Sequence, residues 1–274
     1  MGRVTDREGR RPPPGSWRLR PGLAPVLVLS AALAVSLTAC STAGQDARRP
    51  AGTGPATPQS PAALPSAAAP PALTRAQASA ALITGADLGE AWGPTLGAAT
   101  WRDDLLKATA TDPDCRRLLD VLYTEELFGT SPAPRATAAL DDQVGHAQLH
   151  YRITSHRAAG IDRTLAWLAT LPDTCGRFTA EAARGAAREV RVTGVTLPEA
   201  GDARQGLRVT VTGTTADAGP AVLTVDLVAV RVGDDAISLT NGSLGEAAED
   251  ATRTAVEVGA GRLTEIRRQG RAQV

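Results

Sequence analysis

Hydrophobic residues change their spacing along the chain, and each spacing predicts a local structure. Between residues 145 and 154 they occupy alternate positions, which predicts a strand with one buried face. Later stretches rich in Val, Leu and Thr predict further strands, joined as an antiparallel meander. These strands are expected at residues 189–195, 207–212, 222–232 and 236–240, the last after a Gly233-Asp234-Asp235 turn.

Helical spacing, with apolar residues three and four positions apart, appears in other segments. The clearest begins at Asp112-Pro113, where a capping acid precedes a proline suited to the first helical position. Its apolar face includes Cys115. The other helices are expected at residues 73–82, 158–171 and 244–268, and Pro172 is expected to end the second of these just before Cys175.

Helices beside a meander of strands predict an α+β domain in which helices cover an antiparallel sheet. We expect this single globular domain to occupy residues 73–270. Before it, residues 40–72 are mostly Ala, Pro, Ser, Thr and Gly, without apolar periodicity. Such a segment buries too little surface to offset its ordering entropy, so we expect a disordered tether, or a plain leader with no role in reach.

The chain begins with an Arg-rich segment and an apolar run over residues 23–37. The run is shorter than the ~20 residues that a spanning helix needs, and it fits a secretory signal peptide over residues 1–39. It ends in Leu37-Thr38-Ala39-Cys40, which resembles the lipobox of bacterial lipoproteins. The resemblance implies that Cys40 receives lipid and becomes the first residue, so that its acyl chains hold the protein on the outer face of the cytoplasmic membrane. The alternatives are an ordinary secreted protein and a short anchor helix.

Charge and composition limit the classes of binding partner that we expect. Of the 29 basic and 29 acidic residues, residues 1–39 hold 6 and 2, which leaves 23 basic and 27 acidic residues after cleavage. This mild acidity does not favour binding to nucleic acid. Lys107 is the only lysine, and together with the abundant Ala, Gly and Pro it suggests a GC-rich genome of actinobacterial type.

Three cysteines are present. If Cys40 carries lipid, Cys115 and Cys175 remain as an even pair in an exported protein, so we expect them to form a disulfide. The alternatives are a metal site or a catalytic thiol. A zinc site would need two further ligands, and the three histidines do not have the usual close spacing to either cysteine.

The order of these segments along the chain resembles a known family. A Pro/Ala tether, the segment Asp112-Pro113-Asp114-Cys115 opening a helix, a strand, and the run from Ala158-Ala159-Gly160 through Leu165-Ala166-Trp167-Leu168 to Cys175 resemble the extracellular sensor domain of PknH-type actinobacterial kinases. The same domain occurs in mycobacterial and related lipoproteins. The resemblance covers residues 73–268 and implies an α+β fold, a Cys115–Cys175 disulfide and a cleft for an unidentified ligand. The family commonly has a second cysteine pair downstream, whereas this chain has no cysteine after Cys175.

No catalytic or phosphate-binding motif is found in the sequence. His146 and His150 would lie ~13 Å apart on one strand, too far to share a metal ion. The acid pairs at residues 103–104, 141–142 and 234–235 are typical of turns and caps. Trp92 and Trp101 flank a Gly/Pro loop and are the candidates for a ligand pocket, although large aromatic residues at such positions also cap cores.

These features favour a non-catalytic, lipid-anchored binding or sensor-like module. Its ligand would be a small molecule, a lipid, a glycan or an envelope protein, and no cofactor is expected. One alternative is an envelope hydrolase that uses acids or His150, and another is a structural lipoprotein that only contacts a partner. A histidine beside an acid and a nucleophile would favour the hydrolase, and a deep cleft without clustered titratable groups would favour binding.

Overall fold

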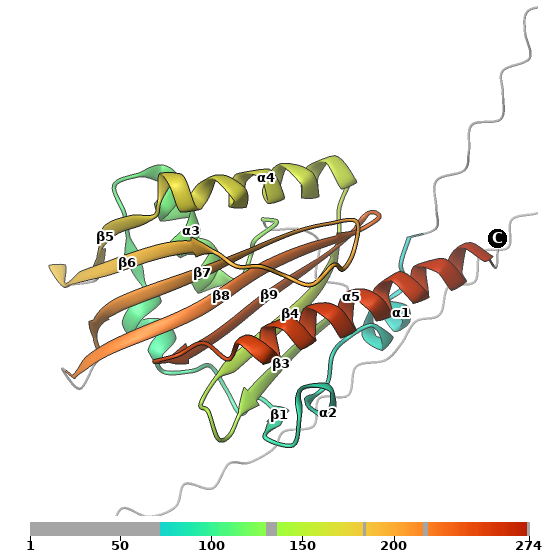
Figure 1. The fold of residues 1–274 in the computed structure, drawn as a ribbon, viewed down its shortest axis with the longest axis horizontal. Helices are drawn as coiled ribbons and strands as arrows, with labels where there is room; N and C mark the ends of the chain where they lie inside the picture. Colours follow the sequence, from blue (N-terminus) through green and yellow to red (C-terminus); the bar gives the residue numbers. More distant parts are fainter. Residues whose placement is uncertain (1–71, 130–135, 183–184, 216–218, 273–274) are drawn as a thin grey trace, which may run out of the picture. The chain divides into compact units, whose positions relative to one another are not determined.

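The structure, a computed structural model, describes residues 72–129, 136–182, 185–215 and 219–272. The predicted signal peptide, Cys40 and nearly all of the predicted tether lie outside these residues. The described part forms one antiparallel sheet with helices on both faces (Figure 1). The predicted α+β class is therefore confirmed.

The sheet of the described residues has nine strands in the order β1-β3-β4-β9-β8-β7-β6-β5-β2. Every pair of neighbours is antiparallel. The strands are β1 Trp92–Pro94, β2 Ala108–Thr109, β3 Ala136–Asp142, β4 Gln148–Ser155, β5 Arg177–Ala182, β6 Ala187–Gly194, β7 Ala203–Thr214, β8 Pro220–Val232 and β9 Asp235–Leu244.

The helices begin where the sequence offers caps. Thr74 and Gln77 form a capping box at the start of α1, and the Asp112 carboxylate accepts hydrogen bonds from the backbone N–H groups of Asp114 and Cys115 at the start of α3. No helix among the described residues is long and apolar enough to cross a membrane. The helices are α1 Arg75–Ala80, α2 Gly85–Leu88, the π-helix η1 Arg102–Leu106, α3 Pro113–Thr124, α4 Ala158–Thr174 and α5 Glu249–Ala272.

Both faces of the central strands are buried. In β8, Leu223 and Leu227 join the hydrophobic cluster under α3, α4 and η1, whereas Val228 and Val230 join the cluster under α1 and α5. Figure 1 shows α4 and α5 as the two long helices along the sheet. This double cover explains why β8 reads as a continuous apolar run rather than an alternating one.

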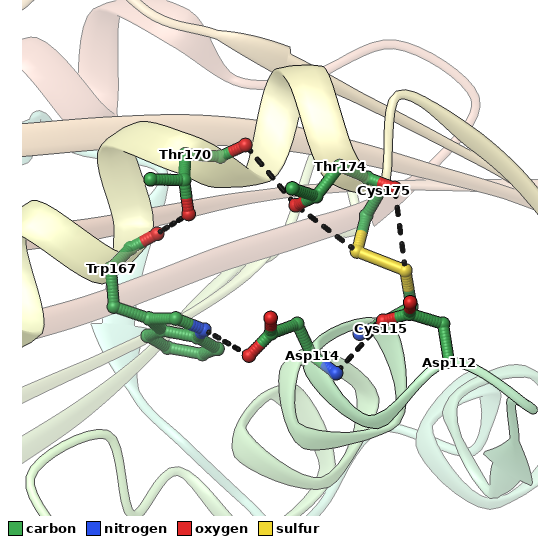
Figure 2. Close-up of a disulfide and its surroundings, with 7 residues drawn as sticks. All are labelled: Asp112, Asp114, Cys115, Trp167, Thr170, Thr174 and Cys175. Atoms are coloured by element: carbon green, nitrogen blue, oxygen red, sulfur yellow. Dashed lines mark hydrogen bonds between the residues drawn. A yellow bond between two sulfur atoms is a disulfide. The ribbon is translucent and has the colours of Figure 1, made fainter.

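The predicted disulfide is confirmed. Cys115 near the start of α3 is bonded to Cys175, the residue after α4, and their Cα atoms are 5.5 Å apart. Figure 2 shows a second interaction between α3 and α4. The indole Nε1 of Trp167 donates a hydrogen bond of 3.0 Å to the Asp114 carboxylate. The Arg117 guanidinium lies 3.8 Å from the centre of the Trp167 ring. Trp167 therefore belongs to the packing of α3 on α4.

Two predicted helix ends are wrong. Pro172 lies inside α4, which continues to Thr174. The missing N–H of a proline removes only one helical bond, and Cys175 still donates to the carbonyl of Leu171 at 2.7 Å. The last helix starts at Glu249 rather than residue 244, because β9 continues to Leu244 in register with β8.

Candidate functional site

A cavity of about 140 Å³ lies between the end of α3 and the sheet face formed by β3, β4 and β9. We call it the Glu125 cavity. Its walls combine apolar side chains with one acid, one histidine, one arginine and several hydroxyl groups. The lining residues are Val121, Glu125, Leu127, Thr137, Ala138, Ala139, His150, Tyr151, Arg152, Leu227, Ser238, Leu239 and Thr240.

Strand β4 brings His150 and Arg152 to this cavity because alternate residues of a strand share a face. Their neighbours Leu149, Tyr151 and Ile153 point to the opposite cluster, under α5. The sequence pattern predicts a strand with one buried face, and in the structure the polar face is partly covered as well. Helix α3 and η1 lie over it, so the side chains of His150 and Arg152 are only 24% and 26% exposed.

Glu125 reaches the cavity from the residue that ends α3. Its φ of 61° is in the left-handed region, which residues other than glycine adopt at a cost of roughly 1 kcal/mol or more. In this conformation its backbone N–H donates to the carbonyl of Val121 at 2.8 Å and closes the last turn. The side chain is 15% exposed and points toward β4 and η1, where its partners lie.

Three cationic or basic groups surround the Glu125 carboxylate. Nη1 of Arg102 lies 2.8 Å from Oε1, and Nδ1 of His150 lies 3.2 Å from the same oxygen. Arg152 is more distant, with Nη2 3.7 Å from Oε2. No arginine therefore forms the paired fork-like contact that a carboxylate accepts most strongly.

Arg102 is already engaged by the end of α3. Its Nη2 donates to the carbonyl of Tyr123 at 2.8 Å and, more weakly, to that of Leu122 at 3.4 Å. A cation at the C-terminus of a helix compensates the unpaired carbonyls and the negative end of the dipole. Arg102 thus fixes the position of Glu125 and is not itself a lining residue.

Burial raises the pKa of Glu125, but this effect is outweighed by the hydrogen bond from His150 and by the charges of His150, Arg102 and Arg152. The pKa of Glu125 consequently lies below its usual range, and the side chain is a carboxylate at neutral pH. Nearby, burial lowers the pKa of His156, with Asp235 opposing that shift. The ring of His156 packs on Phe128 at 5.2 Å and does not line the cavity.

The cavity retains hydrogen-bonding capacity. Nε2 of His150 is buried and has no hydrogen-bond partner among the described residues. The only contact of the Arg152 guanidinium within the described ranges is the long one to Glu125. Arg152 is therefore the charged donor that remains available at the cavity, because the buried Nε2 of His150 is not open to it.

The two predicted pocket tryptophans do not come together. Trp101 is 6% exposed and packs in the α3–α4 cluster against Gly242, where an added Cβ would approach its ring to 2.5 Å. Trp92, at the start of β1, packs against the cluster on the other face. Each borders a separate surface hollow, and neither lines the Glu125 cavity.

The remaining candidates are dispersed. His146 is in the β3–β4 turn with φ 55°, so it does not share a strand with His150 as expected. Asp142 caps that turn through the N–H groups of Val144 and Gly145, as predicted for such acids. Asp235, in contrast, is 1% exposed and pairs with Arg267 at 3.0 Å, because α5 covers the start of β9.

One group among the described residues has the arrangement of potential metal ligands, namely Asp112, Cys115 and Cys175. Both sulfur atoms belong to the disulfide and cannot act as thiolate ligands. His150 is recognisable as a candidate from the sequence, whereas Glu125, Arg102 and Arg152 are not. The available signal was the pair of large polar residues, His150 and Arg152, at alternate positions of β4.

No family model matches the chain, and no curated protein matches it. Among solved structures, it is similar to the extracellular domain of PknH from Mycobacterium tuberculosis, with 13% identity over 73% of this chain and 98% of that one and a TM-score of 0.43. It also overlaps the Saccharomyces cerevisiae Ran-binding protein Mog1p, with 8% identity over 53% of this chain and 80% of that one and a TM-score of 0.21. The first is the kind of domain that the sequence resembles, but neither overlap is high enough to support a statement about ligand or activity.

Proposed function

We propose that this chain is a non-catalytic ligand-binding module that receives a small ligand in the Glu125 cavity. The observation that carries the proposal is a partly apolar hollow bordered by an ionised acid, a histidine, several hydroxyl groups and an arginine whose guanidinium is only weakly paired. A guanidinium that lines an empty volume keeps N–H donors for a ligand.

The lipobox-like segment ending at Cys40 supports a location on the outer face of the cytoplasmic membrane. In that arrangement the ligand would reach the cavity from the envelope, and residues 40–72 would set the distance between the domain and the bilayer. A Cys40→Ala variant tests the anchor. We expect the variant to leave the membrane fraction and to lack the mass of the lipid, and unchanged membrane retention would refute lipidation.

Retention of small molecules tests the binding proposal. The full-length chain would be incubated with a small-molecule extract of the envelope and separated by ultrafiltration, and the retained molecules would be identified by mass spectrometry. The comparison is Ala139→Leu, whose added carbons enter the cavity beside His150 without changing any charge, since Ala139 is the Cα partner of His150 across β3 and β4. We expect at least one molecule that only the wild type enriches. Identical retention by both proteins would mean that the cavity is not the site.

A hydrolase is the second candidate, and one observation favours it. The Glu125 carboxylate lies at Nδ1 of His150, as in an acid–histidine pair that acts as a general base, and the opposite nitrogen, Nε2, is buried without a hydrogen-bond partner among the described residues. Turnover of an activated ester such as 4-nitrophenyl butyrate separates the candidates. The binding proposal predicts a rate that His150→Gln does not change, whereas a loss of at least a hundredfold would favour the hydrolase.

A further inference from the structure

Two arginines and one carboxylate lie in or beside the cavity. Arg102 is held by Glu125 and two helix carbonyls, so the single carboxylate is largely neutralised before Arg152 is counted. Arg152 approaches Glu125 only at 3.7 Å and lines the cavity. A guanidinium has five N–H donors and no acceptor, so its natural additional partner is an anion.

Hydroxyl groups lie on both sides of Arg152. Thr137 of β3 and Ser238 of β9 are its Cα partners in the neighbouring strands, and Thr240 is the partner of His150. All three line the cavity, and none of their hydroxyl groups has a hydrogen bond to another described residue. Hydroxyl donors beside a guanidinium form a donor set suited to an oxyanion.

The apolar part of the cavity wall limits the size and the polarity of the remainder of the ligand. Val121, Leu127 and Leu227 present apolar surface from α3, the following loop and β8. The volume of 140 Å³ is close to that of the cavities of about 150 Å³ that hold a benzene molecule, which has six heavy atoms. A phosphate ion would meet the donors but leave the apolar wall without contact, whereas a carboxylate on a short aliphatic chain matches both.

We infer that the Glu125 cavity binds a short-chain carboxylate of about six heavy atoms, with its carboxylate on Arg152 and the flanking hydroxyl groups and its aliphatic end against Val121, Leu127 and Leu227. This inference rests on the proposed function, since it assigns a ligand class to the same cavity. Glu125 lines the cavity and orients the histidine and the arginine. Its charge is offset by Arg102, which leaves Arg152 to pair with the ligand carboxylate.

Histidine labelling gives a direct probe, because the chain has three histidines and His150 alone lines the cavity. The full-length chain, carrying ¹³C at the ring carbons of histidine, would be titrated with butyrate, with the neutral isostere butyramide and with inorganic phosphate. The His150 signal is assigned by its loss in His150→Gln. We expect a saturable shift with butyrate, and binding of butyramide and phosphate at least about tenfold weaker, as expected when one charge-assisted hydrogen bond is lost.

Arg152→Gln should weaken butyrate binding about tenfold or more and leave butyramide binding unchanged. The matched control is Arg268→Gln, which removes the same charge from an exposed position of α5, where Arg268 pairs only with Glu265, and it should change neither. If Arg152→Gln does not fold, Ala139→Leu keeps every charge and should abolish the butyrate shift by filling the cavity.

Each possible result of these titrations either supports or contradicts the inferred ligand class. Equal binding of butyrate and butyramide, or binding of phosphate in preference to butyrate, would overturn the carboxylate class while leaving ligand binding in place. The absence of a His150 shift with all three probes would also overturn it. The retention experiment with envelope extract then decides the proposed function separately, because it assumes no ligand class.

Discussion

Two acids on opposite faces of the sheet, the buried Asp226 and the half-buried Glu125, are partnered in different ways. Asp226, beneath α5, receives a forked contact from Arg208 at 2.8 and 3.1 Å and a hydrogen bond of 2.9 Å from Thr252. Glu125, at the end of α3, faces three separate groups, none of them forked, and borders an unfilled volume. The first arrangement saturates the acid, and the second leaves donors available.

The surroundings of the two acids differ in the same way. The hydrogen bond that Arg208 donates to Asp226 raises the pKa of Arg208 above its usual range, and Asn241 extends the network to the start of α5 through Ala248 and Thr252. This network fastens α5 to the sheet. Asp226 and Arg208 thus stabilise the packing of α5, whereas we propose that the group around Glu125 serves a ligand.

The largest effect is expected at Asp226. Asp226→Asn keeps the shape but leaves Arg208 with a neutral partner, and breaking a buried ion pair costs about 3–5 kcal/mol in the free energy of unfolding. Denaturant unfolding measures the loss. Glu249→Gln removes the other, 68% exposed partner of Arg208 and should cost less than about 1 kcal/mol. Equal losses in the two variants would contradict the structural role of Asp226.

Close packing beneath α5 gives the next effect. A Cβ at Gly259 would lie 2.0 Å from the hydroxyl oxygen of Tyr151, so Gly259→Ala should destabilise the fold by about 1–3 kcal/mol. The Tyr151 hydroxyl is buried without a hydrogen-bond partner among the described residues, and burial raises its pKa above the usual range. Tyr151→Phe should therefore cost little alone and should recover only part of the loss in the double variant, because the ring carbons Cζ and Cε2 would still lie 2.7 and 2.9 Å from the added Cβ. Additive effects in thermal unfolding would show that this contact is not the cause.

Filling the Glu125 cavity should change the stability of the fold very little. Ala139→Leu adds three carbons where space exists, so we expect a change in unfolding free energy within about 1 kcal/mol. A loss as large as that of Gly259→Ala would show that the α3 side is packed as tightly as the α5 side. The contrast between the two faces would then disappear.

The smallest effect is expected for Glu125→Gln, about 1 kcal/mol or less at neutral pH, because its partners remain partly hydrated. The pKa of Glu125 is lowered in the folded protein from its ordinary 4.5. Its contribution is therefore present above the unfolded pKa and is lost as the pH falls through the folded pKa. Below about pH 4.5 the difference between wild type and variant should shrink, as measured by denaturant unfolding across pH. A difference that grows in acid would contradict this sign.

Local signals in the sequence were sufficient for much of the fold. Asp112-Pro113 placed the start of α3, and the even pair of cysteines gave the disulfide. The short strands β1 and β2 were missed, since two or three residues carry no periodicity and pair only through distant partners in β3 and β5. The extent of α4 past Pro172 depended on contacts that the sequence does not display.

The candidate site was less accessible to prediction. Glu125 joins Arg102 and His150 only because α3 folds over β4, and its left-handed backbone is not specified by any local motif. The tryptophans were chosen for size and loop context, and the structure places them in different hydrophobic clusters. The polar residues of a strand contact solvent only where no other element covers them, and here α3 and η1, which precede β4 in the chain, cover His150 and Arg152.

Ligand-linked stability tests the central claim most directly. A molecule that binds only the folded protein raises the Tm by mass action. With small-molecule envelope extract added, the wild-type chain should show a higher Tm, and Ala139→Leu, whose Tm without extract is expected to match, should show no rise. An equal rise in both proteins, or no rise in either, would contradict the assignment of the Glu125 cavity as a binding site.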